Sequence, residues 1–370
     1  MNGFLADEFS ERLFNGETML IFGLIFMLIS DFDYELPAEL IAQNPLEKRE
    51  DSRMLAINRR AGNFQDTVFC NFPDFLRAGD VVVLNNTKVF PARLFGVSET
   101  GARVEIFLVR EIENQVWETL ARPARRLKIG KKIRFGEELA ARVEEKTTEG
   151  RVIVKFDGDG EKFDELLEEI GQMPLPPYIR RNDGVTNADK NRYQTVFAKR
   201  RGAIAAPTAG LHFTPEILEK IKNLGAIIAE ITLHVGYGTF EPVRVSDLSE
   251  HRVMPERCEI SELTARILKK AKSENRRIVA VGTTTTRALE SSIGEDGEIS
   301  AGSHLAELTI TPGYEFKTVD ALLTNFHLPQ SSLLVLVAAF AGYDLTMKTY
   351  RHAVESRYRF YSYGDCMLII

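Results

Sequence analysis

Residues 103–112 read "RVEIFLVREI", a run in which β-branched and aromatic residues are interspersed with charged ones. Such a run is typical of a β-strand with one face in a core. Similar short runs, separated by turn residues, fill the chain from Pro91 to Phe156, among them "RLFGVS", "VWETLARP", "KKIRFG", "LAARVEE" and "RVIVKFDG". Five or six short strands of this kind predict a small barrel or sandwich.

The pattern on either side of this block is different. From Thr214 onward, helical and strand-like segments alternate, as in "PEILEKIKNLG", "AIIAEITLHVG", "SELTARILKKAKSE" and "RRIVAVG". Alternation of this kind predicts layers of helices on a sheet. We therefore expect an α+β protein: a mixed α/β main domain of residues 27–85 and 160–370, with a β-barrel-like domain inserted at 86–159. A cleft between two domains is a favoured place for a site.

Composition excludes few function classes. The chain has 370 residues, 44% of them hydrophobic, and a formal net charge of −6, which fits a soluble globular protein. Its three cysteines, Cys70, Cys258 and Cys366, show neither metal-ligand spacing nor a disulfide framework. No pair of histidines has the spacing of known zinc ligands. We expect a cytoplasmic protein without a metal.

The N-terminus carries the most apolar run, Met19 to Ile29, "MLIFGLIFMLI". It is too short to span a membrane, and it follows an acidic opening without a signal-peptide cleavage site. We interpret residues 1–26 as a non-native or disordered extension. The sequence leaves the true start open among Met1, Met19 and Met27.

Residues 207–214, "PTAGLHFT", form a loop in front of a helix. Thr214, Pro215 and Glu216 are a hydroxyl cap, a first-turn proline and a first-turn carboxylate, which together predict a helix start. Free N–H groups at such a start can hold an anion. The spacing alone favours the plainer interpretation, a tight connector in which His212 is a hydrogen-bonded core histidine.

Three further stretches combine glycines or helix starts with polar groups. Residues 279–291, "VAVGTTTTRALES", predict a strand that turns into a helix near Thr286. "HVGYGTFEPVR" at 234–244 and "TNFHLPQSS" at 324–332 add histidines, glycines and amides. For 279–291, threonine capping explains the hydroxyls as well as ligand binding does, and for 324–332 the plainer interpretation is that Ser331 or Ser332 caps the helix. The glycines of 234–244 permit close approach to the backbone.

Basic residues gather at 122–134, "RPARRLKIGKKIR", where seven of thirteen residues are Lys or Arg and none is acidic. Lys199, Arg200 and Arg201 form a second cluster. Such surfaces can neutralise phosphates, so the negative net charge does not exclude a nucleic-acid partner.

Taken together, these stretches resemble one family, the S-adenosylmethionine:tRNA ribosyltransferase-isomerases of queuosine biosynthesis. The resemblance runs in order from Ser30 to the C-terminus, through "VVVLNNTKVFPARLFG" (81–96), "MPLPPYIRR" (173–181), "RYQTVFAKRRGAIAAPTAGLHFT" (192–214), "VGTTTTRALES" (281–291) and "SRYRFYSYGDCMLI" (356–369). It implies an enzyme that moves the ribosyl group of S-adenosylmethionine onto 7-aminomethyl-7-deazaguanine (preQ1) in a tRNA anticodon. We expect a monomer, although the sequence does not show the oligomeric state. Epoxyqueuosine-tRNA forms, and adenine and methionine are released.

The resemblance also suggests roles for residues. We place His212 and His234 near the reacting ribose as catalytic candidates, although the general base itself cannot be assigned from the sequence. The candidates for binding S-adenosylmethionine are Thr208, Gly210, Leu211, Phe213, Gly236, Thr239, Thr284, Thr285, Asn325 and His327. The candidates for binding tRNA are Arg122, Arg125, Arg126, Lys128, Lys199, Arg200 and Arg201.

Two positions depart from the family pattern. Met254 stands where a second histidine is expected after His251, and Gln330 where a basic residue is expected, which puts the roles at these positions in doubt. The competing interpretations are a catalytically inactive tRNA-binding module and an S-adenosylmethionine-dependent tRNA methyltransferase. The absence of a glycine-rich loop after the first strand argues against the methyltransferase.

Overall fold

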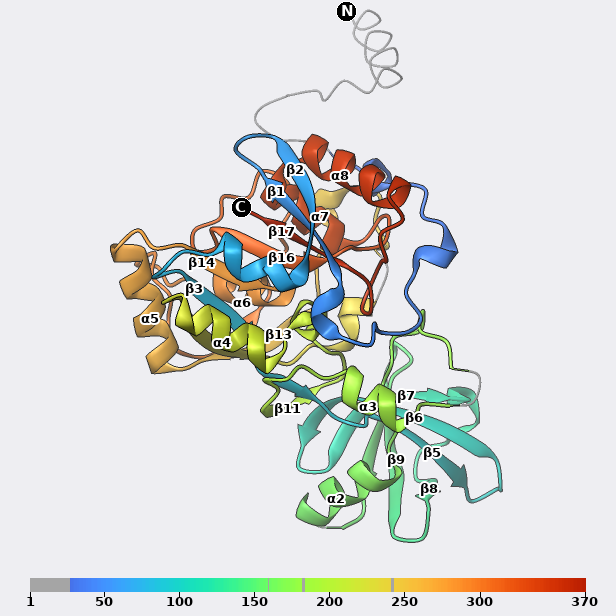
Figure 1. Cartoon of the computed structure of the whole chain (residues 1–370). Coiled ribbons are helices and arrows are strands. Elements are labelled where there is room, and N and C mark those ends of the chain that lie inside the picture. The colour runs from blue at the N-terminus through green and yellow to red at the C-terminus, as the bar shows by residue number, and fades with distance from the viewer. Residues whose placement is uncertain (1–26, 159, 182–183, 241–242) are drawn as a thin grey trace, which may run out of the picture.

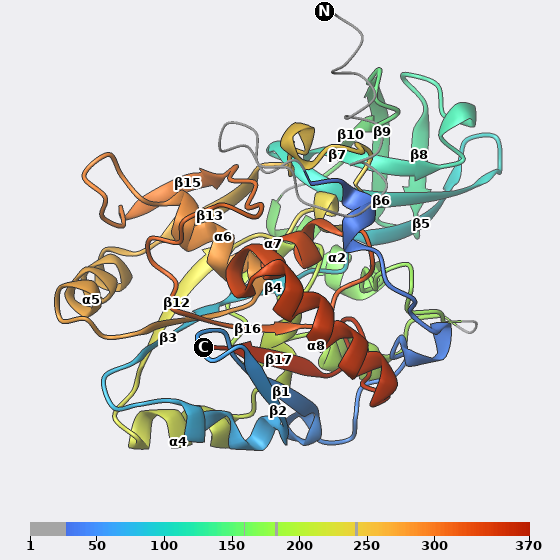
Figure 2. The same cartoon turned by 90° about the horizontal axis from the view of Figure 1, so that it is seen from above.

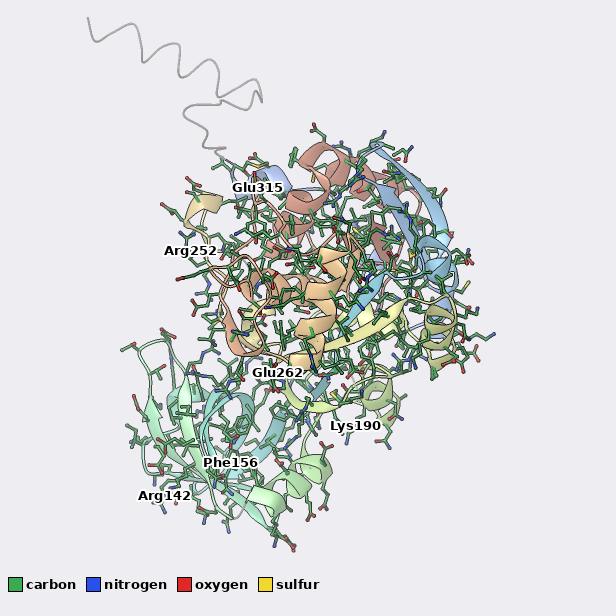
Figure 3. The ribbon with its side chains drawn as sticks, turned by 90° about the vertical axis from the view of Figure 1, so that its left-hand side faces the viewer. Arg142, Phe156, Lys190, Arg252, Glu262 and Glu315 are labelled. Carbon is green, nitrogen blue, oxygen red and sulfur yellow. The ribbon has the colours of Figure 1, made fainter. Side chains whose placement is uncertain are left out.

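The structure is a computed structural model that describes residues 27–158, 160–181, 184–240 and 243–370. A barrel and a larger body built on a sheet lie side by side (Figure 1). In Figure 3 the barrel is marked by Arg142 and Phe156, and the larger body by Arg252 and Glu315. The expectation for residues 1–26 falls outside the described residues.

The barrel is closed by six antiparallel strands in the order β10-β7-β6-β5-β8-β9. Their bounds are β5 Arg93–Ser98, β6 Arg103–Glu113, β7 Val116–Arg122, β8 Lys132–Phe135, β9 Leu139–Lys146 and β10 Val152–Phe156. Helix α2 (Gly160–Ile170) packs on it, with the Phe163 ring 4.8 Å from that of Phe156. The predicted barrel within a mixed α and β fold is confirmed. The domain boundaries at 86 and 159 stay a prediction.

The larger body contains a nine-stranded mixed sheet in the order β15-β13-β12-β3-β14-β16-β17-β1-β2. Its centre is parallel, since β12, β3, β14 and β16 run in one direction. The bounds are β1 Arg53–Asn58, β2 Asn63–Val68, β3 Val81–Asn85, β12 Ile227–Leu233, β13 Glu256–Ile260, β14 Ile278–Val281, β15 Gly302–Ala306, β16 Ala321–Asn325 and β17 Cys366–Ile369.

Both faces of this sheet are covered, so its central strands are apolar on both sides. Val82, Val279 and Leu323 face a core under helix α4 (Pro215–Asn223), whereas their neighbours Val81, Ala280 and Leu322 face a second core. Helices α5 (Glu262–Ser273), α6 (Thr283–Ser291), α7 (Ser332–Ala341) and α8 (Tyr343–Glu355) contribute to that second core. Figure 2 shows α4 on one side of the sheet and α6 and α7 on the other.

Short elements connect these layers. Strands β4 (Thr87–Val89) and β11 (Arg200–Ala203) pair in parallel, and α3 (Asn187–Arg192) precedes β11. The 3₁₀ helices are η1 Ile29–Phe32, η2 Ala38–Leu40, η3 Arg49–Asp51, η4 Phe69–Phe75, η5 Ala124–Arg126, η6 Thr208–His212, η7 Tyr237–Phe240 and η8 Leu248–Glu250.

Helix starts follow the predicted caps with one difference. Thr214 caps α4 through its side chain, which accepts from the Ile217 N–H, as predicted. The helix expected near Thr286 instead begins at Thr283, because Gly282 (φ 99°) makes the turn out of β14 and serves as its N-cap.

Among the described residues, no single helix is long and apolar enough to cross a membrane. Only together are helices α7 and α8 long and apolar enough for a membrane span, and their axes are bent by 118° relative to each other. Most of α7 is buried in the core above the sheet.

Candidate functional site

Two adjoining cavities lie beyond the carboxyl ends of the parallel strands β12, β14 and β16, where open α/β sheets usually bind ligands. We name the first the threonine chamber; its lining includes Pro207, Thr208, Gly282, Thr283, Thr284, Thr324, Asn325 and His327. We name the second the arginine chamber; its lining includes His251, Met254, Glu256, Arg287, Gln330 and Ser332. Tyr178, Leu333 and Tyr361 line both.

The first turn of α6 opens into the threonine chamber. Its leading N–H groups have no carbonyl partner within the helix. The hydroxyls of Thr285 and Thr286 bond back to the carbonyls of Val281 and Gly282 at 2.7 and 3.2 Å. The Thr283 and Thr284 hydroxyls have no hydrogen-bond partner in the described part of the chain, and both residues line the chamber. Thr284 is therefore available to a ligand, whereas the Thr285 hydroxyl is committed to its own helix.

Asn325 ends strand β16 with its amide held on one side only. Its Nδ2 donates to the carbonyl of Tyr361 at 3.0 Å and lies 3.4 Å from that of Asp365, so the amide nitrogen is the end that faces these carbonyls. Its Oδ1 is buried and has no hydrogen-bond partner among the described residues. A buried acceptor without a partner is costly, and it marks a place where a ligand donor fits.

His212 lies behind Asn325. Its Nδ1 is 2.6 Å from Ser52 Oγ and its Nε2 is 3.3 Å from Asn325 Nδ2, so both ring nitrogens are engaged. The ring also packs on Phe69, with centroids 5.3 Å apart. Burial lowers the pKa of His212 to about 4, which keeps the imidazole neutral. This is the hydrogen-bonded core histidine that the spacing favoured.

His327 does line the threonine chamber. Its Nε2 is 3.1 Å from Thr324 Oγ1, its backbone N–H donates to Tyr350 Oη at 3.1 Å, and its carbonyl accepts from Tyr34 Oη. Burial lowers its pKa to about 3. It is a neutral imidazole in contact with the cavity.

His234 lies elsewhere. Its Nδ1 is 2.8 Å from Thr87 Oγ1 on β4, and its ring covers Gly202 on β11, where an added Cβ would come within 2.7 Å of it. It lines neither chamber among the described residues. The His234 ring is thus held by the paired strands β4 and β11 and lies outside both chambers, and its catalytic role stays a prediction.

The remaining candidates for binding S-adenosylmethionine also differ in whether they line a chamber. Thr208 lines the threonine chamber, while Leu211 lines a small hollow beside His212. Gly210 and Phe213 lie behind these cavities: Gly210 packs against Phe197, and Phe213 meets Phe69, Phe72 and Phe197 edge-on. The N–H of Gly236 donates to Glu256 Oε1 at 2.9 Å. The side chain of Thr239 falls outside the described part of the structure.

The arginine chamber contains a buried ion pair that the sequence analysis missed. Arg287 Nη1 lies 2.7 Å from Glu256 Oε2, and the guanidinium also donates to the carbonyls of Ala306, Leu308 and Met254. The two side chains are 8% and 5% exposed. Glu256 is on β13 and Arg287 on α6, so no local spacing links them.

Two further features of this chamber were not predicted. His251 Nε2 lies 2.9 Å from Ser332 Oγ at the start of α7. Tyr361 and Gln330 have φ values of 72° and 54°, a conformation that costs energy for residues other than glycine and that gathers at ligand sites. The Tyr361 ring meets that of Tyr178 edge-on at 4.0 Å where the chambers join.

The basic candidates differ in how their charges are compensated. Arg122, Arg125, Arg126 and Lys128 are exposed and form no ion pair within the described ranges. Lys199 instead pairs with Glu230 at 2.6 Å, and Arg201 pairs with Asp164 and lies over the Phe90 ring. Arg200 is exposed beside them. Among these candidates, the charges without an ion pair in the described ranges are therefore those on the β7–β8 connection with η5, together with Arg200.

No three His, Cys, Asp or Glu side chains among the described residues are grouped so that they could hold a metal ion.

Comparison with known proteins gives consistent results. The family model for the queuosine biosynthesis protein matches residues 29–369. A curated S-adenosylmethionine:tRNA ribosyltransferase-isomerase of Halothermothrix orenii is 49% identical over 346 residues, which cover 93% of this chain and 100% of that protein. The protein of the same name from Syntrophotalea carbinolica is 48% identical over the same shares. The crystal structure of S-adenosylmethionine tRNA ribosyltransferase from Thermotoga maritima matches with a TM-score of 0.53 and 38% identity, covering 92% of this chain and 100% of that one.

Proposed function

The chain belongs to the queuosine biosynthesis protein family, and on that premise we propose that it transfers and isomerises the ribosyl group of S-adenosylmethionine onto preQ1 in a tRNA anticodon. Epoxyqueuosine-tRNA is the product, and adenine and methionine leave. The match over residues 29–369, which includes every wall of the two chambers, carries this conclusion.

S-adenosylmethionine occupies the two joined chambers in this proposal. The arginine chamber has a volume of about 410 Å³, and cavities of roughly 300–1,000 Å³ are usual for small molecules. Tyr178 and Tyr361 supply aromatic surface at the junction, and Thr208, Thr284, Asn325 and His327 supply polar groups. These four are the sequence-based candidates that contact the cavity directly.

The chemistry needs a base. The positive sulfonium acidifies the neighbouring C–H bonds of the ribose, and a pocket that excludes water protects the carbanion-like species formed when such a proton is removed. His251 and His327 are the imidazoles that line the chambers. We therefore propose His251 and His327 as the candidates for the general base, because both contact the cavities. His212 lines neither chamber, and we propose that it positions the Asn325 side chain.

The tRNA binds across the exposed basic residues Arg122, Arg125, Arg126 and Lys128, with Arg200 contributing from β11. Lys199 and Arg201 are less available because Glu230 and Asp164 already neutralise them. Phosphate contacts of this kind position the tRNA on the enzyme but do not recognise its sequence. The preQ1 nucleobase is therefore recognised in the chambers. We also infer that the enzyme acts as a monomer in the cytoplasm and requires no metal.

The products separate this function from its competitors. A methyltransferase would release S-adenosylhomocysteine, and a tRNA-binding module without catalysis would release nothing. Incubation with S-adenosylmethionine and preQ1-containing tRNA, followed by mass spectrometry of the nucleosides and of free adenine, tests the proposal.

A further inference from the structure

The threonine chamber combines a positive helix end with an acceptor that lacks a partner. Helix α6 is nine residues long and begins at Thr283, directly after β14, so its first N–H groups point at the chamber with the positive end of the helix dipole. Asn325 is 2% exposed, and its Oδ1 has no hydrogen-bond partner in the described residues. The helix end attracts a negatively charged group, and the Asn325 oxygen attracts a hydrogen-bond donor.

The two features lie close to each other. Strands β14 and β16 are neighbours with Val281 opposite Leu323, and the Gly282 N–H donates to the Leu323 carbonyl at 2.8 Å. Thr283 and Thr284 at the start of α6 and Asn325 at the end of β16 line the same chamber beyond this pair of strands. A ligand that carries a carboxylate and an ammonium on one carbon can reach both partners at once.

The charge of the chamber also favours such a ligand. Among the described residues that line it, none is Asp, Glu, Lys or Arg. A ligand with a single full charge would therefore have no counter-ion there, which is unfavourable in a buried site. An α-amino acid is a zwitterion without net charge, and its two ends match the helix terminus and the amide oxygen.

We propose that the threonine chamber binds the α-amino-acid end of S-adenosylmethionine, with its carboxylate on the α6 N-terminus and the Thr284 hydroxyl and its ammonium on Asn325 Oδ1. This inference rests on the proposed function. It directs the sulfonium and the ribose towards Tyr178 and Tyr361, and the adenine into the arginine chamber. The methionine that the reaction releases would leave from the threonine chamber.

Displacement of bound S-adenosylmethionine from the full-length wild-type enzyme tests this orientation. The competitors are L-methionine, 3-(methylthio)propylamine, which lacks the carboxylate, and 4-(methylthio)butanoate, which lacks the amine. We expect L-methionine to displace, and each truncated compound to be at least tenfold weaker. If L-methionine fails to displace up to its solubility limit, or if either truncated compound equals it, the proposal is wrong.

Variants assign each contact. In Thr284→Val, which keeps the side-chain shape, displacement by L-methionine weakens severalfold while the amine without a carboxylate is unaffected. In Asn325→Ala the preference for L-methionine over 4-(methylthio)butanoate disappears. Asn71→Ala is the control, because among the described residues the Asn71 side chain bonds only to Thr67 and Cys70 and lines neither chamber. Unchanged preferences in Thr284→Val and Asn325→Ala would overturn the assignment.

Measuring adenine release separates a failure of the proposed subsite from a failure of the proposed reaction. If adenine forms with preQ1-tRNA but the displacement pattern is absent, the orientation is wrong and the function stands. If the displacement pattern is present without adenine release, the amino-acid subsite stands and the reaction is wrong.

Discussion

Asn325 Nδ2 lies 3.3 Å from His212 Nε2 and joins the end of β16 to the loop before α4. Since the amide nitrogen donates, the ring nitrogen accepts, and the ring proton is on Nδ1, directed at Ser52 Oγ 2.6 Å away. The Ser52 hydroxyl can accept it because it donates its own proton to the Arg49 carbonyl at 2.8 Å. His212 is thereby a neutral residue that positions Asn325.

Replacement of His212 by Gln tests this positioning role. Because Asn325 loses one of its anchors, we expect the KM for S-adenosylmethionine to rise and kcat/KM to fall by about tenfold, equivalent to about 1.4 kcal/mol. The shape of the pH profile between pH 6 and 9 stays as in the wild type, because a group with a pKa of about 4 does not titrate there. Loss of one limb of the pH profile would instead identify His212 as the base.

Stability should depend on pH through the two buried histidines. The pKa values of His212 and His327 are about 4 and about 3 in the folded protein, below the ordinary 6.5. The unfolded chain therefore binds two protons below pH 6.5 that the folded protein does not, and the free energy of unfolding falls as the pH drops towards 4. The slope of this fall is about 2.7 kcal/mol per pH unit for two protons.

Urea denaturation at several pH values measures this slope. In the double variant with His212→Gln and His327→Gln, the decrease between pH 6 and 4 becomes shallower, whatever the variant's stability at pH 7. An identical slope in wild type and variant would show that other groups cause the acid sensitivity.

The buried pair of Arg287 and Glu256 should be needed for folding. Arg287→Met removes the buried guanidinium that lies 2.7 Å from the Glu256 carboxylate and donates to three carbonyls, and breaking such a buried pair typically costs about 3–5 kcal/mol. Lys199→Met is the matched control, because the pair of Lys199 with Glu230 is at the surface, where ion pairs contribute about 0–1 kcal/mol. Chemical denaturation of both variants gives the comparison, and equal losses would contradict the importance of burial.

Charge reversal on η5 tests the tRNA surface. The double variant with Arg125→Glu and Arg126→Glu should bind tRNA at least tenfold more weakly, and the slope of log Kd against log salt should fall by about 1 to 2 as two phosphate contacts are lost. Lys220→Glu on α4, an exposed residue outside the barrel and both chambers, is the control. Fluorescence anisotropy across a salt series measures both quantities, and equal slopes for all three proteins would place the tRNA elsewhere.

Local patterns predicted the elements of this fold well, because alternating strands and capped helices are encoded within a few residues. The strands from Arg93 to Phe156 and the start of α4 at Thr214 are examples. The closure of the barrel and the order of the nine strands depend on pairing between distant segments, such as β1 with β17, which short-range patterns do not encode.

The site was predicted in part for the same reason. Asn325 ends strand β16, and Thr284 and His327 come two or three residues after strand ends, so their place at the carboxyl edge of a sheet could be anticipated. Glu256 could not, because its partner Arg287 is thirty-one residues away and on another element. His234 attracted attention as a histidine between glycines, yet the pairing of β4 with β11 takes it away from the chambers.

The measurement that tests the central claim most directly is the product analysis with purified enzyme, S-adenosylmethionine and preQ1-tRNA. We expect epoxyqueuosine in the digested tRNA, with free adenine and methionine in equal amounts. Formation of S-adenosylhomocysteine, or tight tRNA binding without any new nucleoside or adenine, would contradict the assigned reaction.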